Sequence, residues 1–237
     1  MSRRIVSGAL AGLLCAGSIA AAGPSQAPGG PAPAPAPSGG TKVALSPEEL
    51  MARIDRMQRD LHSLSAEFVQ LSRVKLFRQE LRSEGRMLYQ KAGAGSPAAR
   101  LRWEYLRPDP STVLLIGDRA TLRMGTLPPQ TFDTGGDPKM RAIFAQLRLW
   151  LGQGELTTAQ GDYDVSVGGK PAQPALLLSP RSSTPLSATF VRIELHVDGQ
   201  TLQLQRLLLV EKSGDEKEII FSKIQRNPAL SDAQFAL

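Results

Sequence analysis

The sequence predicts a mainly β protein of the α+β class, in which helices cover one face of a large curved antiparallel sheet. Three observations predict this fold. One strongly amphipathic helix lies early in the chain, most of the later segments alternate apolar and polar residues, and short turns join them. Such a sheet must bury one apolar face, and the apolar stripes of the helices are the covers that the sequence offers.

The clearest helix is expected from Ser46 to Leu64. Ser46 is a natural N-cap, Pro47 suits the first helical position, and Glu49 completes a capping box. Its apolar stripe recurs every three or four residues and consists of Leu50, Ile54, Met57, Leu61 and Leu64. The other face is expected to hold Arg53, Asp55, Arg56, Gln58, Arg59 and Asp60. The stripe predicts a buried face, which either fills a core or lines a binding cavity.

Nine to eleven strands are expected after this helix. The first begins at Ser65, and its Ala66 and Phe68 are expected on one face. In the third, Leu101, Trp103 and Tyr105 are expected on one face. The other expected strands cover residues 81–89, 112–116, 120–124, 163–167, 175–178, 190–197, 201–211 and 218–224. In the strand 190–197, the inward set is expected to be Val191, Ile193, Leu195 and Val197.

A second helix is expected to start at Asp137, with Pro138 in its first position and Gly152 as its C-cap. Its apolar stripe consists of Met140, Ile143, Phe144, Leu147 and Leu151. It is the second candidate cover for the sheet.

The first 22 residues have the pattern of a cleavable export signal. Arg3 and Arg4 precede an apolar stretch, and Ala20-Ala21-Ala22 offers a small-residue cleavage site before Gly23. A lipoprotein signal ending at Cys15 is the alternative, although Leu14 precedes that cysteine where a small residue is expected. Cleavage at Ala22 would remove the only cysteine, which excludes thiol catalysis and thiolate metal sites.

Residues 23–42 form a linker rich in proline and alanine, and residues 43–237 are expected to form one folded domain. The net charge is +6, but acidic residues are mixed throughout and no basic run with interleaved aromatic residues occurs. We therefore expect a basic surface and no nucleic-acid partner.

No catalytic or cofactor motif stands out. The two histidines, His62 and His196, are both expected to face solvent, and no glycine-rich phosphate loop or nucleophile elbow is present. We expect no enzyme activity, no cofactor and no metal. Binding of an apolar ligand is the better-supported class of function, because flexible aliphatic stripes suit acyl chains, whereas sugars and bases favour aromatic stacking.

Five segments, in chain order, resemble the LolA-type family of lipoprotein carriers. They are LHSLSAEFVQ (61–70), GRMLY (85–89) with LRWEY (101–105) and Pro108, GDYDV (161–165), LLSP (177–180), and the closing FSKIQRNPALSDAQF (221–235). Each match is weak alone, but together they cover the chain from about Leu45 to its end. The match is to the broad family, because the aromatic residues of one family segment are replaced here by Leu122 and Met124.

The resemblance implies an unclosed β-barrel with α-helices as a lid over an apolar cavity. It implies a monomeric periplasmic carrier that takes acylated lipoproteins, or other acyl-chain lipids, from an inner-membrane ABC-type exporter to an outer-membrane acceptor. The cavity and lid candidates are Leu50, Ile54, Met57, Leu61, Phe68, Trp103, Tyr105, Met140, Ile143, Phe144 and Leu147. The alternative is a periplasmic regulator that senses lipid or lipoprotein on the same fold.

The family's carriers hold the lid shut with an arginine before the tryptophan strand. Here the corresponding region is Lys91 to Pro97, with Arg100 closer to Trp103. Lys91 and Arg100 are therefore both candidates for the latch, and the sequence does not choose between them.

Overall fold

The computed structural model describes residues 45–75, 79–134, 149 and 155–237. The predicted leader and linker lie outside these residues. So do the predicted cavity residues Met140, Ile143, Phe144 and Leu147.

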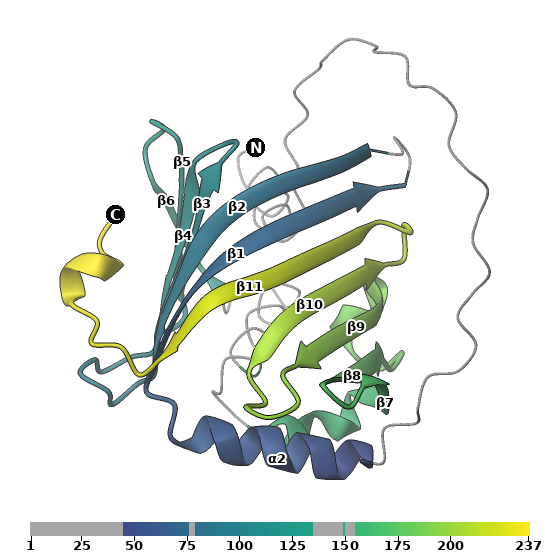
Figure 1. Cartoon of the computed structure of the whole chain (residues 1–237). Helices are drawn as coiled ribbons and strands as arrows, with labels where there is room; N and C mark the ends of the chain where they lie inside the picture. Colours follow the sequence, from purple (N-terminus) through teal and green to yellow (C-terminus); the bar gives the residue numbers. More distant parts are fainter. Residues whose placement is uncertain (1–44, 76–78, 135–148, 150–154) are drawn as a thin grey trace.

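The described residues form one eleven-stranded antiparallel sheet, which confirms the predicted class (Figure 1). The strand order is β6-β5-β4-β3-β2-β1-β11-β10-β9-β8-β7, so β6 and β7 are its two edges and hydrogen bonds do not close it into a barrel. The first six strands are β1 (Ser63–Val74), β2 (Gln79–Gln90), β3 (Arg100–Arg107), β4 (Ser111–Ile116), β5 (Arg119–Met124) and β6 (Gln130–Asp133). The other five are β7 (Tyr163–Lys170), β8 (Gln173–Pro180), β9 (Phe190–Val197), β10 (Leu204–Glu211) and β11 (Glu216–Arg226). The short strand β6 was not predicted.

The register places one apolar set on the inner face of the sheet. Phe68 of β1 lies opposite Phe221 of β11, and Leu207 of β10 lies opposite both Ile219 and Leu195. The largest inner side chains are fully buried, among them Phe68, Met87, Tyr89, Tyr163, Leu176 and Ile193. Alternation with period two therefore predicted most of the core correctly.

One strand departs from its predicted facing. Phe190 is buried and Val191 is 52% exposed, the reverse of the prediction. The register of β9 against β10 shifts between Val210 and Glu211, which pair with Arg192 and Phe190, so Val191 is the extra residue of a bulge. A bulge of one residue inverts the facing of everything beyond it.

Helix α2 (Pro47–Arg59) lies across one end of the curved sheet (Figure 1). Ser46 Oγ accepts from the Glu49 backbone N–H at 3.1 Å, so the predicted N-cap is confirmed. The helix ends five residues before the predicted Leu64, because Asp60 is its C-cap and β1 begins at Ser63. Leu61 therefore precedes the sheet and Leu64 belongs to it.

Asp55 was expected on the polar face of the helix, but its side chain is buried. It accepts from the backbone N–H of Leu156 at 2.7 Å and of Thr157 at 3.1 Å, and from the Thr157 hydroxyl at 3.0 Å. These residues start the short 3₁₀-helix η2 (Leu156–Gly161), whose first N–H groups have no partner within the helix. The carboxylate thus fixes α2 to η2. Two further 3₁₀ turns are η3 (Pro185–Ala188) and η4 (Asp232–Phe235).

Candidate functional site

Four aromatic side chains cluster on the inner face of β1, β3 and β11. The Phe68 ring centroid lies 4.4 Å from that of Trp103 and 5.4 Å from that of Tyr105, and Trp103 lies 6.2 Å from Phe221. Gly85 of β2 makes room for the cluster, because a Cβ there would lie 2.4 Å from the Phe68 ring. The structure thus brings the predicted cavity residues Phe68, Trp103 and Tyr105 together.

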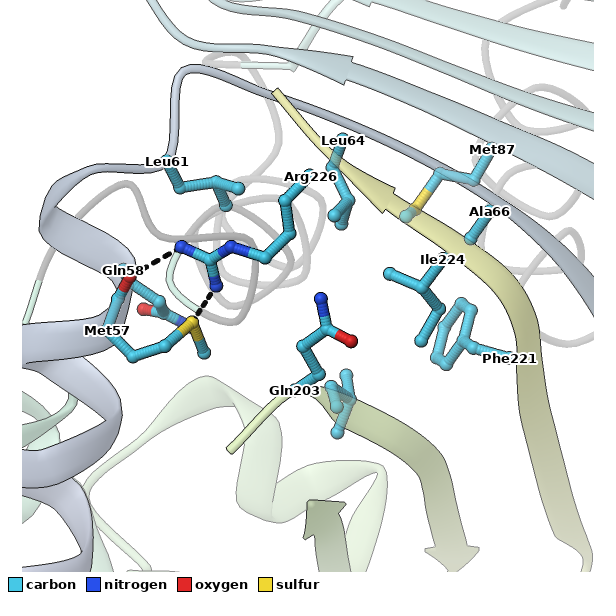
Figure 2. A pocket seen from close by; sticks show the side chains of 11 residues that line it. Met57, Gln58, Leu61, Leu64, Ala66, Met87, Gln203, Phe221, Ile224 and Arg226 are labelled. Carbon is cyan, nitrogen blue, oxygen red and sulfur yellow. Dashed lines mark hydrogen bonds between the residues drawn. The ribbon is translucent and has the colours of Figure 1, made fainter. Parts of the chain in front are cut away.

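A pocket lies between the C-terminal end of α2 and the inner face of the sheet (Figure 2). The cavity itself has a volume of about 50 Å³, and about 480 Å³ is free of atoms when the solvent space at its mouth is included. Its lining is mainly aliphatic and comes from α2, β1, β2, β10, β11 and the adjoining turns. The lining residues are Met57, Gln58, Leu61, Leu64, Ala66, Met87, Gln203, Leu204, Phe221, Ile224 and Arg226.

Two of the predicted cavity residues, Met57 and Leu61, line this pocket. Leu50 and Ile54, from the same predicted stripe, are buried in the core and do not line it. Phe221 belongs to both the pocket and the aromatic cluster, so the cluster continues the wall of the pocket.

Arg226 connects the sheet to the end of α2 across this pocket. Its Nη2 donates to the Met57 carbonyl at 2.7 Å, and its Nη1 contacts Met57 Sδ (Figure 2). The last carbonyls of a helix lack intrahelical partners and form its negative end, so a guanidinium is favourable there.

Asn227 reinforces the same junction. Its side-chain oxygen accepts from the backbone N–H groups of His62 at 2.8 Å and Ser63 at 3.3 Å, and its amide donates to the Asp60 carbonyl at 2.9 Å. Its φ is +56°, a left-handed conformation that asparagine tolerates better than most residues. Together, Arg226 and Asn227 tie the end of β11 to the helix-to-strand connection.

The two latch candidates from the sequence lie elsewhere. Arg100 is buried on β3, where its Nη1 donates to Asp232 Oδ1 at 2.7 Å and its guanidinium stacks 4.3 Å from the Phe235 ring centroid. It therefore holds the C-terminal turn η4. Lys91 donates its backbone N–H to the His62 carbonyl at 2.8 Å. Among the described residues, the arginine that contacts α2 from the sheet is Arg226.

The outer face of the sheet carries a network of ion pairs. Burial of Glu218 would raise its pKa, but hydrogen bonds from Arg206 and Arg73 outweigh burial and hold the pKa below its usual value. Glu104 on β3 has a lowered pKa for the same reasons, with Arg86 and Arg102 as partners. His196 was expected to face solvent, yet only 12% of its side chain is exposed, because it contacts Glu194 and Arg206. His62 is exposed, as predicted.

Among the described residues, no group of three or more histidine, cysteine, aspartate or glutamate side chains is placed to hold a metal ion. In that same part of the chain, no helix is both long enough and apolar enough to cross a membrane.

Sequence reasoning missed the roles of Arg226, Asn227 and Gln203. Arg226 and Asn227 lie in the closing segment that resembles the carrier family, but the segment alone does not show which residues face α2. Contacts between residues more than 160 positions apart leave no local periodic signal.

A family model described as "Outer membrane lipoprotein carrier protein LolA" matches residues 59–237. No curated protein matches the chain. Among solved structures, MucB is 19% identical, with a TM-score of 0.49 over 81% of this chain and 62% of that one. A DUF1329 family protein from Desulfovibrio piger is 15% identical, with a TM-score of 0.46 over 80% of this chain and 95% of that one. A LolA-superfamily protein from Nitrosomonas europaea is 12% identical, with a TM-score of 0.43 over 82% and 99%.

Proposed function

Because the chain belongs to the LolA family of outer-membrane lipoprotein carriers, we propose that its pocket shelters the acyl chains of lipoproteins during transfer across the periplasm. The observation that carries this proposal is the aliphatic pocket at the end of α2, with Arg226 bridging helix and sheet. Burying an acyl chain contributes about 0.8 kcal/mol for each CH₂. The pocket needs no catalytic group for this role.

The proposed route follows the family. Export by residues 1–22 places the chain in the periplasm, an inner-membrane ABC-type exporter loads it, and an outer-membrane acceptor receives the lipoprotein. The Arg226 contact with the Met57 carbonyl is the proposed latch, because breaking it frees the end of α2 that borders the pocket. This hydrogen bond from a charged group contributes about 1.5–3 kcal/mol to holding the end of α2 against the pocket, and the Asn227 hydrogen bonds reinforce it.

The first test is native mass spectrometry of the protein purified from periplasm. A carrier is expected to retain an acylated lipoprotein or another acyl-chain lipid, and the same spectrum shows whether the mature chain begins at Gly23. Recovery of empty protein only, together with no uptake of a fluorescent acyl probe, would argue against this function.

A pair of variants tests whether the ligand binds in the pocket. Leu204→Glu puts a carboxylate on the half-buried pocket wall and is expected to weaken acyl-probe binding at least tenfold, since a charge is costly in apolar surroundings. Leu106→Glu is the control, because Leu106 is 46% exposed and outside the pocket. Equal binding by the two variants would place the ligand elsewhere.

A lipoprotein-release assay separates carrier from regulator. A carrier is expected to extract lipoprotein from inner-membrane vesicles that contain the exporter. Stoichiometric binding to one membrane protein without any release of lipoprotein would favour the regulatory alternative instead.

A further inference from the structure

Strands β10 and β11 separate before either ends. Their pairing starts at Val210↔Glu216 and stops at Arg206↔Ile220, although β10 begins at Leu204 and β11 continues to Arg226. Beyond that point each strand pairs only with its other neighbour: β10 with β9, and β11 with β1. We call this split the seam and define it by residues 203–205 and 221–225.

A bulge lies beside the seam in each strand. Leu204 and Arg206 pair with the adjacent residues Val197 and His196, so Gln205 is the extra residue in β10. In β11, Ser222 and Gln225 pair with Glu67 and Ser65 of β1, which leaves one extra residue at 223–224. Each bulge bends its strand, and the two bulges lie on the sides turned away from each other.

Lys223 shows that the bend in β11 is built in. Its φ is +49°, a left-handed conformation that costs a non-glycine residue about 1 kcal/mol or more. The rest of the strand maintains this conformation, and Lys223 Nζ pairs with Glu67 on β1 at 2.9 Å. The seam therefore lies beside a bulge and a left-handed residue of β11, and is more than a missing hydrogen bond.

Hollows lie on both sides of the seam and share Gln203, Phe221 and Ile224 in their linings. The inner one is the apolar pocket. The outer one holds about 730 Å³ of atom-free space, much of it open to solvent, and is lined by Gln173, Gln203, Gln205, Arg206, Ile220, Phe221, Ser222, Lys223 and Ile224. Figure 2 shows Gln203 facing Ile224 and Phe221 across the pocket.

The polar side of the seam suits an amide-bearing head group. Three glutamines line the outer hollow, and a glutamine amide both donates and accepts hydrogen bonds. Gln173 donates to Gln205 at 3.1 Å and Gln205 donates to Asp198 at 3.2 Å, so Gln203, at the seam itself, is the glutamine best placed to meet a head group. No carboxylate lines the outer hollow, and its two cations already have partners, since Arg206 pairs with Glu218 and Lys223 with Glu67. A neutral amide is therefore a better match than a phosphate.

We propose that the seam is a lateral portal: the acyl chain passes between β10 and β11 into the pocket, while the peptide amides of the acylated residue stay in the outer hollow. This proposal rests on the proposed function and specifies its route and its head-group chemistry. The portal lets cargo enter and leave without moving α2.

The test joins the two sides of the seam in the full-length protein with Cys15 replaced by alanine. Gln203→Cys and Ser222→Cys are linked by a short flexible thiol-to-thiol reagent, and uptake of a fluorescent C16 acyl amide is followed by stopped flow. We expect at least tenfold slower uptake and release. The Thr121→Cys/Thr131→Cys pair is the matched control, since its hydroxyls lie 2.9 Å apart on β5 and β6, away from the seam.

A second linked pair tests the competing route. Asp60→Cys/Asn227→Cys fixes the end of α2 to the end of β11 without changing the pocket lining, and the portal predicts that this link leaves probe uptake within twofold of the unlinked variant. Unchanged uptake with the seam linked, or loss of uptake only with α2 fixed, would overturn the portal. Ile224→Trp, which narrows the seam without any link, should also slow uptake. A wild-type protein that takes up no probe would refute the carrier function itself.

Discussion

The two ends of helix α2 have different surroundings. In its first turns, Leu50, Met51 and Ile54 are 0–3% exposed and belong to the core beside β7, β8 and η2. In its last turn, Met57 is only half-buried and borders the pocket together with Gln58. One helical stripe is therefore core at its start and pocket wall at its end.

This difference explains why the apolar periodicity of the helix could not show whether its stripe meets a filled core or a ligand space. An apolar stripe has the same spacing whether it meets a filled core or a ligand space. The partners decide the outcome: Asp55 joins α2 to η2 about a hundred residues later, and Arg226 reaches the helix end from β11.

Leu50→Ala should give the largest loss of stability among these variants. A small loss would contradict the assignment of the first turns of α2 to the core. The side chain is fully buried, so its loss should lower the free energy of unfolding by about 3 kcal/mol, measured by urea denaturation. Met57→Ala is the matched variant at the other end and should cost less than half as much while changing acyl-probe affinity. Equal stability losses would mean that both ends are core.

Asp55→Ala should cost about 2 kcal/mol, because it leaves two backbone N–H groups of η2 without their acceptor. Asp55→Asn retains one acceptor oxygen and should recover part of the loss. Hydrogen exchange at Leu156 and Thr157 provides the local measurement. If those amides stay protected in Asp55→Ala, the carboxylate is not what joins α2 to η2.

Glu218→Gln tests a site remote from both ends of the helix. Because the folded pKa of Glu218 is lowered, its contribution is present above the unfolded pKa of about 4.3 and disappears as pH falls through the folded pKa. The variant should lose about 1 kcal/mol at pH 7, and the difference from wild type should disappear as pH falls through the lowered pKa of Glu218. Unfolding curves across this range check it, and probe binding at pH 7 should not change.

Ser46→Ala should give the smallest effect, about 0.5 kcal/mol, because it removes only an exposed side-chain acceptor at the N-cap. Ser46→Asp, which keeps an acceptor, is the control. Thermal unfolding is the measurement, and the pocket at the far end of the helix should bind probe as before. A change in probe binding would show that the two ends are coupled.

The sequence was sufficient for features governed by local chemistry. The N-cap residue Ser46 located the helix start, although the Glu49 side chain pairs with Arg53 and does not complete the predicted capping box. Period-two alternation located most strands and the inward set of β3, Leu101, Trp103 and Tyr105. Of the residues it proposed for a cavity, Met57 and Leu61 line the pocket, whereas Leu50 and Ile54 are buried in the core.

The remaining features depend on long-range pairing. The early end of α2 follows from where β1 starts pairing with β2 and β11, and the facing of Phe190 follows from a bulge against β10. Neither a bulge nor a buried capping carboxylate changes local composition. For this reason Asp55, Arg226 and the seam could not be located before the strands were placed.

The paired bulges have an evolutionary consequence. Because each is one extra residue in a strand, the opening between β10 and β11 is specified by chain length and not by side-chain identity. Deleting Gln205 and Lys223, neither of which lines the inner pocket, is expected to restore a continuous ladder and seal the wall. Relatives could therefore gain or lose such an aperture through single-codon insertions and deletions while every side chain of the pocket stays the same.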